Sequence, residues 1–229
     1  MGVGAQAPAL SSFLRGIAVY FIHMKRGNFI VFDGLDGSGK STQAKRLAEY
    51  IFDLSKTNSV FLTREPYHSE YYQQIRQTLK SNKNPQDSAE LFLELFVKDR
   101  HVHLKDIEHC LRQGIHVISD RYKYATLGFQ QAQGISLEKL LALHKDMLVP
   151  DIVFFIDLAT DQILARMEKD VLRKVSEVFE QQKMMELLRQ NFLNLPQQLP
   201  QEHIVILNGN QEPDQVFVEI KKHIDILFT

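Results

Sequence analysis

Five short apolar runs, with helical patterns between them, constrain the fold of this chain more than any other feature. The runs cover residues 29–32, 60–63, 115–119, 152–156 and 204–207. Each run is almost continuously β-branched, aliphatic or aromatic, as in strands that are buried on both faces of a parallel sheet. Parallel strands require crossover helices, and such helices cover both faces of the sheet. The sequence therefore predicts an α/β fold with a doubly wound, five-stranded parallel sheet.

The segments between the runs show the spacing of amphipathic helices. The clearest stripe repeats at intervals of three and four residues between positions 44 and 51. Further helices are expected after Ser88, Ser136 and Thr160, which we interpret as N-cap residues. The sequence PQQLP at residues 196–200 is expected to form a loop because it contains two prolines.

Length and charge limit the number of domains and the kinds of partner. The chain has 229 residues, enough for one sizeable core, and we expect a single domain over residues 24–229. It carries 27 basic and 28 acidic side chains, so no field of one sign surrounds the whole molecule. We therefore expect neither nucleic acid nor a membrane as a partner. Any anionic ligand must be bound by a local cluster of cations.

Residues 1–23 do not resemble the rest of the chain. They contain Arg15 and no acidic residue, and their apolar run at 17–22 is far shorter than the roughly 20 residues of a membrane-spanning helix. The charged region that opens a signal peptide is missing, whereas a transit peptide stays an alternative. We expect a tag, an extra start or a poorly ordered tail. The single cysteine, Cys110, cannot form an internal disulfide, which favours a reducing, cytoplasmic location.

A glycine-rich loop lies between the first apolar run and the first helical stripe. Residues 34–41 read GLDGSGKS and satisfy the motif G-x-x-x-x-G-K-[ST] in the strand-to-helix context that the motif requires. The alternative is a glycine-rich turn with an incidental Lys-Ser pair. We expect the loop to hold the phosphates of ATP, with Lys40 at the outer phosphates and the Ser41 hydroxyl on Mg²⁺. The expected nucleotide contacts are Gly34, Leu35, Asp36, Gly37, Ser38, Gly39, Lys40, Ser41 and Thr42.

Two arginines follow the ends of other predicted strands. Arg64 lies in TREP after the second apolar run, and Arg121 lies in DRY after the third. The carboxyl ends of parallel strands meet at one edge of a sheet, where the glycine-rich loop also lies. A guanidinium group matches the oxygens of a phosphate, so this pair could hold a monophosphate beside ATP. Each arginine could instead form a surface ion pair.

Together these motifs resemble the thymidylate kinase family of P-loop nucleoside-monophosphate kinases. The resemblance rests on the loop with an acid at its third position, on TREP, on an apolar helix that ends in Asp99-Arg100, and on DRY. It is close over residues 29–130. It implies that ATP phosphorylates dTMP to dTDP in dTTP synthesis, with Mg²⁺ and without a protein base. It also suggests a homodimer through the helices around residues 88–111.

The resemblance implies roles at the phosphates and the sugar. Asp36 would bond the 3′-hydroxyl of the sugar, and Arg64 and Arg121 would hold the monophosphate. Asp120 would face the phosphates and Mg²⁺, directly or through water. Lys40, Arg121 and Asp36 would then be catalytic.

It implies further roles around the base. Phe96 would stack on thymine and Arg100, four residues later on the same helix face, would bond its carbonyl oxygen. Thr126 would touch the base, Phe129 would crowd the 2′ position, and Gln130 would complete the A-Y-Q-like element of the family, which reads Gly128-Phe129-Gln130 here. Without the resemblance, Phe96 would be interpreted as a core residue.

The chain departs from the family pattern near the acceptor. Tyr67-His68 stand where the family has two glycines, and Ala125 stands where it usually has serine, followed by Thr126. These changes affect base and sugar specificity more than reaction type. A kinase for another monophosphate or for a deoxynucleoside therefore stays an alternative, as does a nucleotide-binding switch, although no guanine-reading N-K-x-D element is present.

A candidate lid lies near residues 166–175. Members of the family place one catalytic arginine either in the phosphate loop or in a lid, and here Gly37 occupies the loop position. Among the basic residues of the segment, we expect Arg173 to close over the phosphates and to be catalytic. A solvated helix face is the alternative. The histidines at 101, 103, 109 and 116 lack metal-ligand spacing and are expected to be structural or exposed.

Overall fold

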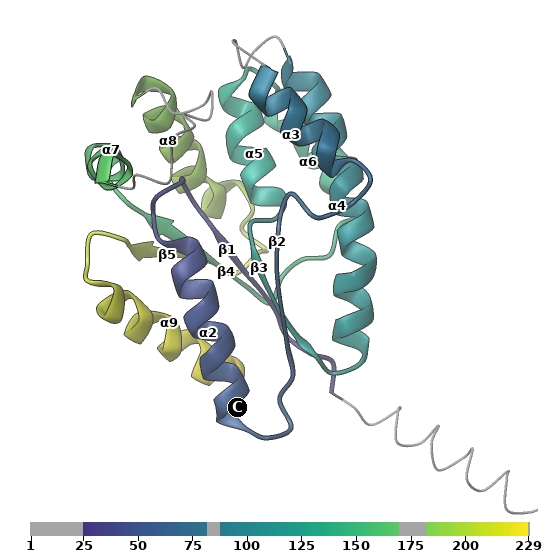
Figure 1. The fold of residues 1–229 in the computed structure, drawn as a ribbon, viewed down its shortest axis with the longest axis vertical. Helices are drawn as coiled ribbons and strands as arrows, with labels where there is room; N and C mark the ends of the chain where they lie inside the picture. Colours follow the sequence, from purple (N-terminus) through teal and green to yellow (C-terminus); the bar gives the residue numbers. More distant parts are fainter. Residues whose placement is uncertain (1–24, 82–87, 170–181, 229) are drawn as a thin grey trace, which may run out of the picture.

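The computed structural model describes residues 25–81, 88–169 and 182–228, and these form a three-layer α/β fold (Figure 1). The strands are β1 (Phe29–Asp33), β2 (Val60–Arg64), β3 (His116–Asp120), β4 (Ile152–Asp157) and β5 (Ile204–Asn208). They form one sheet in the order β2-β3-β1-β4-β5, and every strand pair is parallel. The predicted five-stranded parallel sheet is confirmed, with each strand within one residue of its expected bounds.

Described helices cover both faces of this sheet. The described helices are α2 (Lys40–Leu54), α3 (Tyr72–Ser81), α4 (Ala89–Arg112), α5 (Lys123–Ala132), α6 (Leu137–His144), α7 (Thr160–Lys169), α8 (Gln182–Gln198) and α9 (Pro213–Leu227).

Alternation along the central strands separates two cores. Phe29 and Val31 of β1 belong to a cluster with residues of α4, α5, α6 and α8. Ile30 and Phe32, on the opposite face, pack against α2 and α9. Because both faces are covered, successive residues of β1 are all fully buried, which explains the continuous apolar run in the sequence.

The predicted helix starts are met to different degrees. The Ser136 hydroxyl accepts a hydrogen bond from Lys139 N at 3.3 Å and so caps α6. Ser88 occupies the N-cap position of α4, but its side chain makes no capping hydrogen bond. The interpretation of Thr160 as the N-cap of α7 was wrong by one position, because Thr160 is already helical. The residue before the helix is Ala159, whose carbonyl accepts hydrogen bonds from Gln162 N and Ile163 N.

The prediction of a loop over residues 196–200 was wrong, because α8 continues through Pro196 to Gln198. Phe192 and Leu195 are almost completely buried in the core, and Leu199 N donates to Leu195 O at 2.8 Å. Proline in the last turn of a helix removes one backbone donor, and the burial of this helix face outweighs that loss.

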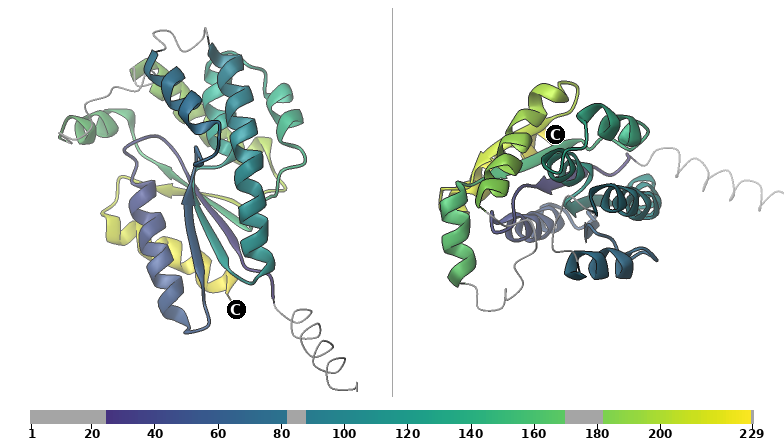
Figure 2. Two further views of the ribbon diagram at one scale, coloured as in Figure 1. Left: turned by 45° about the vertical axis from the view of Figure 1, so that its right-hand side comes forward. Right: turned by 90° about the horizontal axis from the view of Figure 1, so that it is seen from above.

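Helices gather beyond the carboxyl ends of the strands. The views of Figures 1 and 2 show α3, α5, α6 and the start of α4 at that end of the sheet. Within residues 25–81, 88–169 and 182–228, no helix is both long and apolar enough to span a bilayer. The predicted extension at residues 1–23 lies outside the described residues.

Candidate active site

The glycine-rich loop joins β1 to α2 in a conformation that requires its glycines. Gly34, Gly37 and Gly39 have φ angles of 138°, 85° and 101°, which L side chains rarely adopt. A Cβ atom at Gly34 would also lie 3.0 Å from the carbonyl oxygen of Ile156. The loop leads directly into the N-terminus of α2, where backbone N–H groups and the helix dipole favour an anion.

Two cations lie in or beside this loop. Lys40 is buried, and its Nζ donates to Leu35 O at 2.8 Å and lies 3.5 Å from Asp36 Oδ1. Arg121 follows β3 with a φ of 78°, and its NH2 donates to Asp36 Oδ1 at 2.6 Å. The loop and the end of the neighbouring strand therefore meet at Asp36.

A buried carboxylate, Asp33, lies beneath these cations. It accepts hydrogen bonds from Gly34 N at 2.9 Å and Tyr122 N at 3.3 Å, and Arg121 NH1 lies 3.7 Å away. Burial raises the pKa of Asp33 to about 6, although the positive charge of Arg121 opposes the shift. Burial lowers the pKa of Lys40, and Arg121 adds to this effect. Burial alone would lower the pKa of Arg121, but the carboxylates of Asp36, Asp33 and Asp120 outweigh it and raise this pKa.

Two oxygen donors meet at the start of α2. The Ser41 hydroxyl donates to the carboxylate of Asp120, which is mostly buried at the end of β3. Hydroxyl and carboxylate oxygens suit Mg²⁺, which keeps several waters and needs only one or two protein ligands beside phosphate oxygens. The donor set therefore fits Mg²⁺, even though the described residues hold no group of three His, Cys, Asp or Glu side chains around a common point.

The loop and both strand ends open onto one cavity of about 650 Å³. The predicted site residues that line it are Asp36, Gly37, Gly39, Lys40, Ser41, Thr42, Arg64, Phe96, Arg100, Asp120, Arg121, Thr126, Phe129 and Gln130. Gly34, Leu35 and Ser38 belong to the same loop but do not line the cavity. Arg173 lies outside the described residues.

The aromatic residues expected at the base and sugar are partly exposed to this cavity rather than enclosed in the core. Phe96 is half-buried, with the ring of Phe92 stacked at 6.0 Å between centroids. Phe129 is also half-buried, and the guanidinium carbon of Arg121 lies 5.4 Å from its ring centroid. Arg64 is exposed at the cavity and makes no ion pair with any described residue.

Arg100 reaches the cavity from a buried polar network. Its Nε donates to Glu65 Oε2 at 2.7 Å, and its NH2 donates to Thr126 Oγ1 at 3.0 Å. The other oxygen of Glu65 lies 3.1 Å from His103 Nδ1, and His103 Nε2 lies 2.9 Å from Thr63 Oγ1. His103 is thus a buried structural residue, as predicted.

Sequence reasoning missed one wall of the cavity. Tyr72, Arg76 and Leu79 of α3 line it together with Glu65 and Pro66. The spacing of Tyr72, Arg76 and Leu79 puts them on one helix face, and this periodicity was the signal available in the sequence. Glu65 carried no such signal, since its partner Arg100 lies 35 positions away.

Comparison with known proteins gives a consistent result. Residues 32–220 match the family model of thymidylate kinase. A probable thymidylate kinase of Methanococcus aeolicus is 33% identical to this chain, and the match covers 85% of this chain and 94% of the relative. A probable thymidylate kinase of Thermococcus kodakarensis is 35% identical, and the match covers 87% of this chain and 98% of the relative. The thymidylate kinase structure from Ehrlichia chaffeensis is similar with a TM-score of 0.67 at 27% identity, covering 87% of this chain and 99% of its own. The thymidylate kinase structure from Candida albicans has a TM-score of 0.70 at 25% identity, and the match covers 88% of this chain and 92% of that one.

Proposed function

The chain belongs to the thymidylate kinase family, and we propose that it transfers the γ-phosphoryl group of ATP to dTMP to form dTDP. The observation that carries this proposal is a single cavity lined both by the glycine-rich loop and by arginines from two neighbouring strand ends. A triphosphate on the loop and a monophosphate on the arginines would lie side by side. Phosphoryl transfer depends mainly on such placement and on positive charge near the transferred group.

On the ATP side, the loop and Lys40 bind the phosphates. Lys40 and Arg121 supply positive charge where negative charge spreads over the transferred group. Ser41 and Asp120 would hold Mg²⁺, and a bound Mg²⁺ would neutralise charge on the phosphate oxygens. Asp36 orients both cations, since it lies within 3.5 Å of Lys40 and 2.6 Å of Arg121.

On the acceptor side, Arg64 and Arg121 bind the monophosphate, and Arg76 adds a third guanidinium to the same cavity. Phe96 stacks on the base, Arg100 and Thr126 read its edge, and Phe129 and Gln130 border the sugar. Asp36 also accepts a hydrogen bond from the 3′-hydroxyl of the sugar. An oxygen of the acceptor phosphate is the nucleophile, so the protein need not supply a base.

The proposal is tested by a coupled assay with ATP and a panel of dTMP, dUMP, dCMP and dGMP. The panel matters because the Candida albicans relative is described as having a broad substrate specificity. We expect dTMP to have the highest kcat/KM. Turnover of none of these acceptors would contradict the proposal.

Arg121→Ala tests the central contact. We expect it to lower kcat/KM for dTMP by about a thousandfold, the scale on which an arginine acts in phosphoryl transfer. Arg26→Ala, at an exposed arginine before β1 that pairs with Asp151, is the matched control and should change kcat/KM by no more than about twofold. Equal effects of the two substitutions would argue against this role for Arg121.

Three further features belong to the proposal. Arg173 acts as a lid residue, the active form is a homodimer through the helices around residues 88–111, and the enzyme works in the cytoplasm. The single cysteine supports the last of these, because it excludes an internal disulfide.

A further inference from the structure

The guanidinium of Arg100 is held on two sides by residues near the carboxyl ends of β2 and β3. Only 1% of this residue is exposed, although it lines the cavity. Nε donates to Glu65 at 2.7 Å, while NH2 donates to Tyr122 O at 3.2 Å and Thr126 Oγ1 at 3.0 Å. The hydrogens of Nε and NH2 are therefore already used within the protein.

The remaining nitrogen, NH1, contacts His144 at the end of α6. NH1 lies 2.9 Å from His144 Nε2, and His144 Nδ1 lies 2.6 Å from Leu140 O. A carbonyl oxygen can only accept, so Nδ1 carries the hydrogen and Nε2 is the acceptor for Arg100.

The surroundings of His144 keep the ring neutral and therefore able to accept. His144 is 3% exposed, and burial together with the charge of Arg100 lowers its pKa to about 3. Lys123 of α5 acts in the same direction, whereas Leu140 O and the more distant Glu65 oppose it. An imidazole in such a site is costly unless both nitrogens are hydrogen-bonded, and Arg100 is the partner that satisfies Nε2.

The contact leaves one donor for a ligand. NH1 has two hydrogens, and His144 accepts one of them. Among the described residues, NH1 makes no second hydrogen bond with the other. No residue of α6 lines the cavity, so His144 can act on a ligand only through Arg100.

We propose that His144 is a positioning residue that holds NH1 of Arg100 so that one N–H of this guanidinium faces the base of the acceptor nucleotide. Helix α6 thereby helps to determine acceptor affinity without touching the acceptor. This inference rests on the proposed function, because it assumes that the nucleobase lies against Arg100.

Two substitutions separate the acceptor role of His144 from its volume. His144→Phe keeps a ring but removes the acceptor, and His144→Gln places an amide oxygen about where Nε2 lies. We expect His144→Phe to raise KM for dTMP by roughly tenfold, as for a lost hydrogen bond to a charged group. KM for ATP and kcat should change by no more than about twofold, and His144→Gln should recover most of the loss in dTMP affinity. His203→Gln, at an exposed histidine directly before β5 that lies outside both the cavity and the helices around residues 88–111, is the matched control and should behave like the wild type.

A double substitution tests whether the effect passes through Arg100. In an Arg100→Met background, His144→Phe should change KM for dTMP by less than about twofold, because coupled residues give non-additive effects. If His144→Phe does not fold, His144→Asn replaces it, since its shorter side chain cannot reach NH1 and should raise KM for dTMP in the same way.

The outcomes distinguish this inference from the function on which it rests. A wild-type enzyme that phosphorylates none of the tested nucleotides would overturn the proposed function. An active wild type with an unchanged KM for dTMP in His144→Phe, or with equal defects in His144→Phe and His144→Gln, would overturn the positioning role alone.

Discussion

Asp33, directly before the glycine-rich loop, binds a proton more tightly in the folded chain than in the unfolded chain. Its pKa is raised from an ordinary 3.8 to about 6, so between these values the folded chain retains a proton that the unfolded chain has lost. The stability from this group is therefore fully present below pH 3.8 and is lost as the pH rises through 6. The raised pKa corresponds to a contribution on the order of 3 kcal/mol.

Asp33→Asn cannot ionise and should remove this dependence. Between pH 4 and pH 7, the wild type should lose on the order of 3 kcal/mol of stability that Asp33→Asn does not lose. The difference in free energy of unfolding, variant minus wild type, should therefore rise by this amount. Urea unfolding at several pH values measures this difference. Asp33→Asn also removes one acceptor oxygen, which changes the free energy of unfolding by the same amount at every pH. The change of the difference with pH is therefore free of this effect. Parallel pH curves for the two proteins would show that Asp33 does not titrate in this range.

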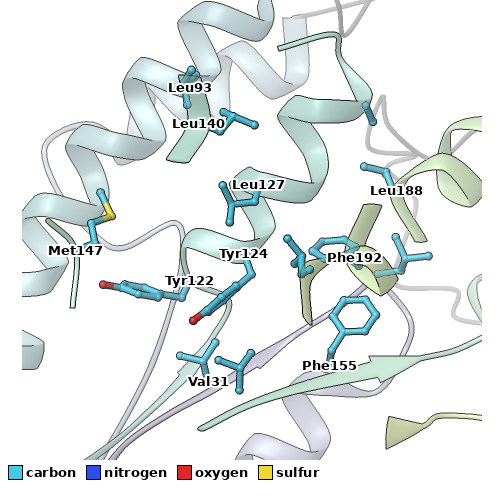
Figure 3. Packing of buried hydrophobic residues seen from close by; sticks show 14 of the residues in the cluster. Val31, Leu93, Tyr122, Tyr124, Leu127, Leu140, Met147, Phe155, Leu188 and Phe192 are labelled. Atoms are coloured by element: carbon cyan, nitrogen blue, oxygen red, sulfur yellow. The ribbon is translucent and has the colours of Figure 1, made fainter. Parts of the chain in front are cut away.

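At the scale of elements, α5 and α8 pack closely enough to exclude a methyl group. A Cβ atom at Gly128 of α5 would lie 2.7 Å from the ring of Phe192 in α8. This ring cannot withdraw, because it is fully buried with its centroid 4.7 Å from that of Phe155 in β4 (Figure 3). We expect Gly128→Ala to lower the free energy of unfolding by about 1 to 3 kcal/mol through overpacking, measured by chemical denaturation.

The partner substitution provides the control. In a Phe192→Leu background the ring is absent, so Gly128→Ala should cost little or should stabilise α5 by up to about 1 kcal/mol, because alanine favours a helix more than glycine does. A Gly128→Ala protein as stable as the wild type would mean that α5 and α8 can move apart without a loss of stability.

At the scale of the whole molecule, the cavity is built from one half of the sheet. Its lining residues lie between positions 36 and 130, at the ends of β1, β2 and β3 and on α2 to α5. A ligand that spans these elements should stabilise the whole fold. We expect dTMP at about 100 times its Kd to contribute about 2.7 kcal/mol, which raises Tm by about 5 to 10 °C in a chain of this size.

Differential scanning fluorimetry with dTMP and thymidine checks this expectation. Thymidine lacks the phosphate that Arg64 and Arg121 would bind, so the Tm increase should be much smaller at equal concentration. The increase with dTMP should also be largely lost in Arg121→Ala. An equal increase with thymidine and dTMP would show that the arginines do not hold the monophosphate.

The sequence by itself determined the strands, the loop and the family. The apolar runs predicted β1 to β5 because two-sided burial leaves a continuous pattern, and the loop was readable because its turn needs glycine at 34, 37 and 39. These signals are local. They do not depend on which strand lies next to which.

Only the tertiary structure decided the strand order β2-β3-β1-β4-β5, which brings Arg64 and Arg121 to the loop. It also decided that Pro196 is helical and that His144 and Glu65 hold Arg100. Each of these outcomes depends on groups that are far apart in the chain and share one buried environment. Such pairings leave no periodicity in the sequence, because burial and hydrogen bonding act through space rather than along the chain.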